Sequence, residues 1–393
     1  MKGMVSKLPK VHGRPRVLMV CARYFPDMGG IETHVHEVAR RISASGQFEV
    51  TVLTTDRSRR LPPRASVDGV EVLRVPAWPH GRDYYFAPQI ARIVGERGRW
   101  DLVHCQGIHT PVPVLAMLSA RRSRTPYVAT FHTGGSSLRH RNVLRPLQWR
   151  AIGGLLRDAA SLVAVGGFEA ELVATQAHLG AKPVIVVRNG GTLPPPPPGT
   201  AVVPGRIVSP GRLERYKGHH HVIEALPYVL RDLPDAHVSV LGSGSYEHEL
   251  RRLADRLGVA DRVSITSIDP ADRAGMAATL GQASVIAAMS QYEAHPVAVM
   301  EGLSVGRPVV GADKAGIGDL VAEGWVRGVP ADASAESFSR ILVAAMSEPA
   351  LVDPHDLPTW DSCADQLADI YRYALAETTS PSAPPRVQAR STS

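Results

Sequence analysis

The sequence predicts an α/β protein made of two doubly wound, parallel-sheet domains. Short runs rich in valine and leucine alternate with helical patterns along the chain, which is typical of parallel sheets covered by helices. The length of 393 residues is enough for two domains. Five consecutive prolines at 194–198 lie between the two halves. Such a run is extended and stiff and cannot pair in a sheet, so it indicates a linker.

The strands follow from the apolar runs, taken in chain order. We expect strands at 16–21, 50–54, 70–75, 102–104, 127–131, 162–165, 184–187, 207–209, 237–241, 263–265, 285–288 and 308–310. The spacing of Val35, Val38, Ala39 and Ile42 predicts an amphipathic helix after the first strand. A final amphipathic helix is expected at 359–375, with Trp360 and Ile370 buried.

These elements give the following expected organisation. Residues 1–14 form a flexible N-terminus, 15–190 an N-terminal Rossmann-like domain, 191–204 a proline-rich linker, 205–350 a C-terminal Rossmann-like domain, 355–377 a closing helical segment and 378–393 a disordered tail. The proline run has a second interpretation, as a docking site for a proline-binding partner. The linker is the favoured interpretation because the run separates two domains.

Composition narrows the class of protein. Hydrophobic residues make up 44% and charged residues 21%, which is ordinary for a globular protein. No run approaches the ~18 apolar residues of a membrane span, and the basic N-terminus lacks the apolar core of a signal peptide. Three scattered cysteines form neither a disulfide framework nor a zinc-binding spacing. These features predict a cytoplasmic protein.

The net charge of +7 fits a phosphate-rich ligand or an anionic membrane surface. Nucleic acid is not expected as a partner, because no nucleic-acid-binding module is present and aromatic residues make up only 5%. The segment 138–150 interleaves arginines with apolar residues. It either contacts the inner face of a membrane peripherally or is a helix that covers the sheet, and the second interpretation is favoured.

Two glutamates predict a ligand site in the second half. Glu293 precedes an apolar helix expected at 297–303, Glu301 lies inside that helix, and the helix ends near Gly306. Ligands of α/β sheets bind at such strand-to-helix junctions. The helix start suits an anion, and the carboxylates suit the hydroxyls of a sugar or ribose.

Two cations lie in another strand-to-helix loop, at 208–218. Arg212 and Lys217 can together hold a diphosphate. Arg215 and the histidines at 219–221 are expected to be solvated, since neighbours on a helix diverge by ~100° and cannot share a metal. Gly242 follows the strand at 237–241 and permits close approach of a ligand, or only a turn.

In the first half, Gly29 and Gly30 open the first helix, where free backbone N–H groups and the lack of side chains allow a ligand to approach. His132 ends the strand at 127–131 and so points toward the same edge of the sheet. His34 and His36 are two residues apart and diverge. We expect His34 at the cleft and His36 at the surface.

Six segments in this order resemble the retaining GT-B glycosyltransferases of family 4. They are Gly29–Glu32, Thr130–His132, Arg188–Gly190, Gly211–Gly218, Leu241–Gly244 and Glu293–Glu301, and the resemblance spans roughly residues 15–375. It implies two domains that face a central cleft, with the closing helix crossing back to the first domain. It also implies hexosyl transfer from a nucleoside-diphosphate sugar to an acceptor hydroxyl.

The resemblance also implies roles for the residues. Arg212 and Lys217 would hold the diphosphate, Glu301 the ribose, and Glu293 would lie by the sugar. By the same resemblance, His132 contacts the transferred sugar. Gly29, Gly30 and Gly242 would belong to the donor side, and His34 and Asn189 to the acceptor side.

No Asp-x-Asp pair occurs, so neither a metal nor another cofactor is expected. The sequence departs from the family at Ala294-His295-Pro296, where small residues and phenylalanine are usual, and Pro296 removes one backbone N–H. This departure leaves the donor sugar open. Two alternatives remain: a nucleotide-sugar 2-epimerase of the same fold, and a nucleotide-sugar-binding protein that has lost its chemistry.

Overall fold

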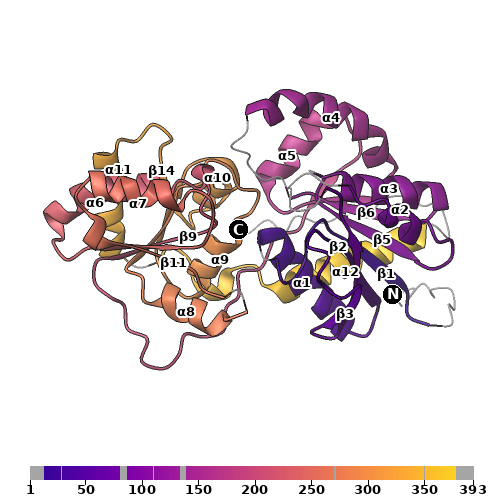
Figure 1. Ribbon diagram of the computed structural model, residues 1–393, viewed down its shortest axis with the longest axis horizontal. Helices are drawn as coiled ribbons and strands as arrows, with labels where there is room; N and C mark the ends of the chain where they lie inside the picture. The colour runs from indigo at the N-terminus through magenta and orange to yellow at the C-terminus, as the bar shows by residue number, and fades with distance from the viewer. Residues whose placement is uncertain are drawn as a thin grey trace, which may run out of the picture.

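The computed structural model has two lobes, each built on a β-sheet with helices on both faces (Figure 1). It describes residues 13–27, 29–79, 86–108, 110–132, 139–269, 271–348 and 350–377, with the backbone alone for 139–147. The tail predicted at 378–393, and all but two residues of the N-terminus predicted at 1–14, lie outside the described residues.

The first lobe contains an eight-stranded sheet in the order β3-β4-β2-β1-β5-β6-β7-β8. Its strands are β1 (Arg16–Val20), β2 (Glu49–Asp56), β3 (Arg64–Val67), β4 (Val70–Pro76), β5 (Leu102–Gln106), β6 (Tyr127–Thr130), β7 (Ser161–Ala164) and β8 (Val184–Val186). All pairs are parallel except β3 with β4. The sequence did not predict β3, because this edge strand has only one apolar residue besides alanine and buries no residue fully.

The second lobe contains a six-stranded parallel sheet in the order β11-β10-β9-β12-β13-β14. Its strands are β9 (Arg206–Pro210), β10 (His237–Leu241), β11 (Val263–Thr266), β12 (Val285–Ala288), β13 (Val309–Ala312) and β14 (Arg327–Val329). The other five strands were predicted. The edge strand β14 was missed because its three residues, Arg-Gly-Val, make no apolar run.

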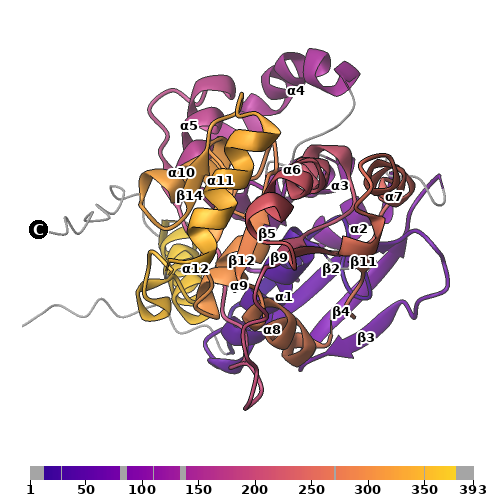
Figure 2. The same cartoon turned by 90° about the vertical axis from the view of Figure 1, so that its left-hand side faces the viewer.

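Helices cover both sheets. They are α1 (Gly30–Ala44), α2 (Gln89–Val94), α3 (Pro111–Ser123), α4 (Arg139–Asp158), α5 (Gly167–Gln176), α6 (His219–Asp232), α7 (Glu247–Arg256), α8 (Arg273–Gly281), α9 (Val297–Ser304), α10 (Ala315–Ala322), α11 (Ala335–Met346) and α12 (Trp360–Glu377). Helices α6 and α11 lie side by side on the second lobe (Figure 2). No helix within the described part of the chain is both long and apolar enough to cross a membrane.

Helix α12 packs on the first lobe, although it follows the second lobe in sequence (Figure 1). Its Trp360 and Tyr371 are buried in one hydrophobic cluster with Val35 and Val38 of α1. This burial follows the apolar spacing that predicted both helices. His36 is a correction: it is buried rather than at the surface, and its ring lies 3.1 Å from the Tyr24 hydroxyl.

Helix α4 packs against α3, and Trp149 and Leu156 belong to the buried core of the first lobe. Part of the segment 138–150 therefore covers the sheet. The side chains of 139–147, on which the membrane interpretation depends, lie outside the described residues.

The chain leaves the first lobe after β8 through a crowded crossing. A Cβ atom on Gly190 would lie 2.2 Å from the backbone nitrogen of Trp360, and one on Gly191 would lie 2.3 Å from the Cβ of Met300. Only glycine fits at such distances. These two glycines therefore allow the crossing segment to pass against α9 and the start of α12.

Candidate active site

A cavity of about 340 Å³ lies between the lobes, where strands of both sheets end. In each sheet the strand order reverses at this point, between β1 and β5 and between β9 and β12. Parallel sheets bind ligands at such switch points. The predicted site residues that line the cavity are Gly29, Gly30, His132, Asn189, Arg212, Lys217, Glu293 and Glu301.

Gly242 and His34 were also predicted but are not among the lining residues. A Cβ atom on Gly242 would lie 2.0 Å from the carbonyl oxygen of Gly211, and its φ of +159° is unfavourable for other residues. Gly242 thus lies behind the loop that carries Arg212 and allows that loop to pack closely. His34 is fully buried behind His132.

Lys217 forms an ion pair with Glu293 across the cavity wall. Lys217 lies in the short turn after β9, and Glu293 lies in the loop before α9. Tyr216 contacts both cations of the turn: its hydroxyl accepts a hydrogen bond of 2.8 Å from Arg212, and its ring centre lies 5.6 Å from the Lys217 ammonium. The two cations predicted for a diphosphate therefore lie together, and one is already balanced by a predicted site glutamate.

His219 is a second correction, since it was expected to be solvated and is 1% exposed. Its Nδ1 lies 2.8 Å from the Ser209 hydroxyl and its Nε2 lies 3.2 Å from the carbonyl oxygen of Arg212. Burial lowers the pKa of His219 to about 4, so the ring is neutral near pH 7. Since a carbonyl can only accept, Nε2 carries the proton, and His219 holds the Arg212 loop in place.

Glu301 is buried inside α9 and forms an ion pair with Arg273, the first residue of α8. Burial raises the pKa of Glu301, and the neighbouring Arg273 opposes that rise. Arg273 was not predicted as a site residue. Its pairing with Glu301 spans 28 positions and depends on how α8 and α9 pack, so no local pattern indicates it.

On the first lobe, imidazole and amide groups joined by hydrogen bonds form and support the cavity wall. The Nε2 atom of His132 lies 2.7 Å from the side-chain oxygen of Gln106, at the end of β5. The His34 ring packs edge-on against His132, with ring centres 4.7 Å apart. Burial lowers the pKa of His34 to about 4, which keeps it uncharged near pH 7. Gln106 is a site residue that sequence patterns did not reveal.

Asn189 connects this wall to the second lobe. Its side-chain nitrogen donates to the carbonyl oxygen of His295 at 3.3 Å, which turns its oxygen toward Nδ1 of His34, 2.8 Å away. His34 therefore donates from Nδ1. A second link joins the lobes at Asp319, whose carboxylate accepts a hydrogen bond of 2.8 Å from the backbone N–H of Phe168. Both links lie beside the cavity.

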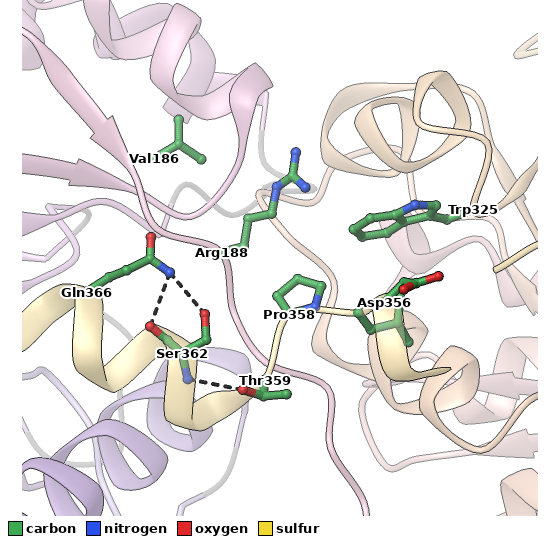
Figure 3. Close-up of a pocket in the computed structure, with 9 residues that line it drawn as sticks. Val186, Arg188, Trp325, Asp356, Pro358, Thr359, Ser362 and Gln366 are labelled. Carbon is green, nitrogen blue, oxygen red and sulfur yellow. Dashed lines mark hydrogen bonds between the residues drawn. The ribbon is translucent and has the colours of Figure 1, made fainter. Parts of the chain in front are cut away.

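Within the described residues, no three histidine, cysteine or acidic side chains are grouped to hold a metal ion. A second hollow, of about 590 Å³, lies where the chain crosses between the lobes (Figure 3). In it, the Arg188 guanidinium lies 5.4 Å from the ring centre of Trp325 and pairs with Glu323. None of the predicted site residues lines this hollow.

Comparisons with known proteins identify relatives for both lobes. Residues 28–191 match the family model described as Glycosyltransferase Family 4, and residues 201–355 match that of glycosyl transferases group 1. The chain is 30% identical to the D-inositol 3-phosphate glycosyltransferase of Nocardiopsis dassonvillei, over 89% of this chain and 91% of that protein. It is 26% identical to the phosphatidyl-myo-inositol mannosyltransferase of Mycobacterium tuberculosis, over 91% and 96% respectively.

Solved structures show the same fold. Sucrose-phosphate synthase from Thermosynechococcus elongatus aligns with a TM-score of 0.75 and 18% identity, over 92% of this chain and all of that one. Anabaena HepE in complex with UDP and glucose aligns with a TM-score of 0.64 and 19% identity, over 93% of this chain and all of that one. The GT-B fold expected from the sequence is thereby confirmed.

Proposed function

This chain belongs to the group 1 glycosyltransferases with a family 4 N-terminal domain, and from this premise we propose which reaction the enzyme performs. It transfers a hexosyl group from a nucleoside-diphosphate sugar to an acceptor hydroxyl, and it retains the anomeric configuration. The observation that carries this proposal is the convergence of Arg212, Lys217, Glu293 and Glu301 on a cavity that also holds His132.

The two cations bind the diphosphate. When the donor enters, Lys217 exchanges its partner Glu293 for a phosphate oxygen, and the planar Arg212 adds paired donors. Negative charge grows on the diphosphate as its bond to the anomeric carbon breaks. Cations held in place before the reaction stabilise that charge in the transition state. Free of its lysine, Glu293 accepts hydrogen bonds from the sugar.

The remaining groups orient the reactants. Glu301 accepts hydrogen bonds from the ribose, and the paired Arg273 favours the charged form of its buried carboxylate. His132 and the backbone at Gly29 and Gly30 face the sugar from the first lobe. The acceptor oxygen attacks the anomeric carbon on the face that the diphosphate leaves, and its proton passes to the leaving phosphate oxygen. Chemistry then depends on positioning as well as charge.

We also propose that the transfer needs no metal, because Arg212 and Lys217 supply the positive charge beside the diphosphate. Activity measured in excess EDTA should equal activity without it. Activity that disappears in EDTA and returns with Mg²⁺ or Mn²⁺ would contradict this assignment. A cytoplasmic location, with or without peripheral contact at the inner face of a membrane, stays a prediction from composition.

The test of function is a panel of nucleotide sugars incubated with candidate acceptors and analysed by mass spectrometry. Inositol phosphate and phosphatidylinositol belong in the panel because two relatives are named for such acceptors. A mass gain of one hexose on an acceptor, with the donor's anomeric configuration kept in its NMR coupling, supports the proposal. Donor epimerised without an acceptor would favour the 2-epimerase, and binding without turnover would favour a protein that has lost its chemistry.

A further inference from the structure

A chain of buried polar side chains runs from helix α12 to the cleft. The Tyr371 hydroxyl lies 2.6 Å from Nδ1 of His104, and the Thr130 hydroxyl lies 2.7 Å from Nε2 of the same ring. Gln106 follows on the same face of β5, with its side-chain nitrogen 3.3 Å from each ring nitrogen of His104. Its oxygen lies 2.7 Å from Nε2 of His132. All five side chains are less than 8% exposed.

These hydrogen-bonded side chains determine the orientation of the Gln106 amide. Burial lowers the pKa of His104 to about 3, so that ring is neutral, and both of its nitrogens already have hydroxyl partners. An atom 3.3 Å from both ring nitrogens lies over the face of the ring. The face of an aromatic ring attracts N–H groups and repels oxygen. The amide nitrogen therefore faces His104, and the amide oxygen faces His132.

This orientation also settles the tautomer of His132. An amide oxygen only accepts, so Nε2 of His132 carries a proton and donates it to Gln106. When neutral, a ring that carries its proton on Nε2 accepts hydrogen bonds at Nδ1. Orienting partners of this kind fix both the direction of a histidine ring and the nitrogen that it offers.

We propose that Gln106 is the positioning residue of His132, holding its ring as the Nε2–H tautomer in the cleft wall and connecting it through His104 to Tyr371 of α12. This inference rests on the proposed function, in which His132 contacts the transferred sugar. It adds a residue that touches neither donor nor acceptor, and it gives the closing helix a part in the site.

The first test measures the tautomer directly and needs no substrate. In protein with ¹⁵N-labelled histidine, long-range ¹H–¹⁵N spectra distinguish the two neutral tautomers, and the His132 signals are those lost in His132→Ala. The wild type should show Nε2–H, and Gln106→Leu should shift His132 toward a mixture or toward Nδ1–H. A wild-type Nδ1–H ring, or an unchanged tautomer in Gln106→Leu, would overturn the proposal whatever reaction the enzyme performs.

The second test is kinetic. Losing one buried hydrogen bond should lower kcat about tenfold in Gln106→Leu while the KM for the donor stays within about threefold. The same substitution in a His132→Ala background should cause no further loss. Equal losses in both backgrounds would mean that Gln106 acts independently of His132. Gln148→Leu is the control, because Gln148 bonds the Ile108 carbonyl in the same lobe, and its kcat should stay within about twofold.

The third test uses Gln106→Glu, which preserves the shape of the side chain and so does not depend on how leucine packs. A carboxylate against Nε2–H favours the imidazolium and raises the pKa of His132. Other titratable groups around the ring include His34 on α1, His104 on β5 and the Lys217–Glu293 pair across the cavity. The acid limb of the kcat profile should move to higher pH in Gln106→Glu. A profile that does not move would contradict the proposal.

Discussion

The two walls of the cleft hold their side chains by different physical means. On the second lobe, each glutamate of the motif pairs with a cation, Lys217 with Glu293 and Arg273 with Glu301. On the first lobe, the groups around His132 are neutral amides, hydroxyls and imidazoles joined by hydrogen bonds. One wall therefore offers charge that can be exchanged with a charged ligand. The first-lobe wall instead offers hydrogen-bonding groups that orient the bound ligand.

The difference sets the expected size of mutational effects. A charged side chain of the second lobe would meet the ligand through charge-assisted hydrogen bonds, each worth about 1.5–3 kcal/mol. Removing one neutral hydrogen bond costs about 1 kcal/mol. Substitutions on the second lobe should therefore change ligand binding and turnover most. Substitutions on the first lobe should instead change the orientation of the His132 ring and the ring nitrogen that carries its proton.

The largest effect is expected for Lys217→Ala. Without its ammonium, the departing diphosphate loses one of two fixed cations, and kcat should fall by about a hundredfold to a thousandfold. The melting temperature should change little, because the site lies at an open cavity. Lys314→Ala, at an exposed lysine of the same lobe, is the matched control and should retain activity. Equal activity of Lys217→Ala and wild type would contradict the proposal that Lys217 stabilises the departing diphosphate.

The next effect separates the two glutamates. Glu301→Ala should weaken binding of the bare nucleoside diphosphate by about tenfold to a hundredfold, through the lost charge-assisted hydrogen bonds to ribose. Glu293→Ala should leave that binding within about threefold, because it frees Lys217 for phosphate, while transfer falls strongly. Calorimetry beside transfer assays measures both. Equal losses of nucleotide affinity in the two variants would mean that the glutamates do not divide these roles.

More of the cavity residues on the second lobe than on the first could be predicted from the sequence. Arg212, Lys217 and Glu293 lie in strand-to-helix segments, and Glu301 lies inside the helix that follows Glu293. Local patterns place all four near one edge of the sheet. The partners that complete the site, such as Arg273, come from other elements. Their contacts depend on helix packing, which local periodicity does not specify.

The same limit explains the errors. His219 looked like part of a basic turn, and only the fold shows that its ring reaches Ser209 and the Arg212 carbonyl. Most strands were predictable because central parallel strands are continuous apolar runs. Two of the four edge strands, β3 and β14, were not, since an edge strand needs less apolar surface. A local pattern thus predicts that a side chain lies near the site, and packing decides its partner.

The buried His34 of the first lobe should make the free energy of unfolding fall in acid. His34 would bind a proton near pH 6.5 when unfolded, whereas burial lowers its folded pKa to about 4. Between these values the unfolded state holds more protons, so the free energy of unfolding falls as the pH falls through this window. Above pH 6.5 the stabilising contribution is complete.

His34→Gln removes this contribution. The wild type should lose about 2 kcal/mol more unfolding free energy than His34→Gln between about pH 7 and about pH 5, as measured by urea denaturation. His355→Gln, at an exposed histidine, should behave as the wild type. Parallel pH dependence of the wild type and His34→Gln would show that His34 is not held neutral by the fold.

The smallest effect is expected outside both walls, at the crossing between the lobes. Arg188 lies over Trp325 (Figure 3). It pairs with Glu323, but its side chain is 37% exposed. An exposed ion pair contributes at most about 1 kcal/mol and is weakened by salt. Arg188→Ala should therefore change the unfolding free energy by about that amount or less, and the difference from wild type should shrink as NaCl is added.

The kcat of Arg188→Ala then shows whether turnover depends on the contacts where the chain crosses between the lobes or on the side chains of the cavity. The next residue, Asn189, bonds both His34 and the His295 carbonyl, so the alignment of the first-lobe wall is set beside Arg188 and not by it. Arg188→Ala should keep kcat within about twofold and the donor KM within about threefold, whereas Asn189→Ala should lower kcat about tenfold. If Arg188→Ala instead reduced kcat as much as Lys217→Ala, the arrangement of the lobes would limit turnover more than either wall.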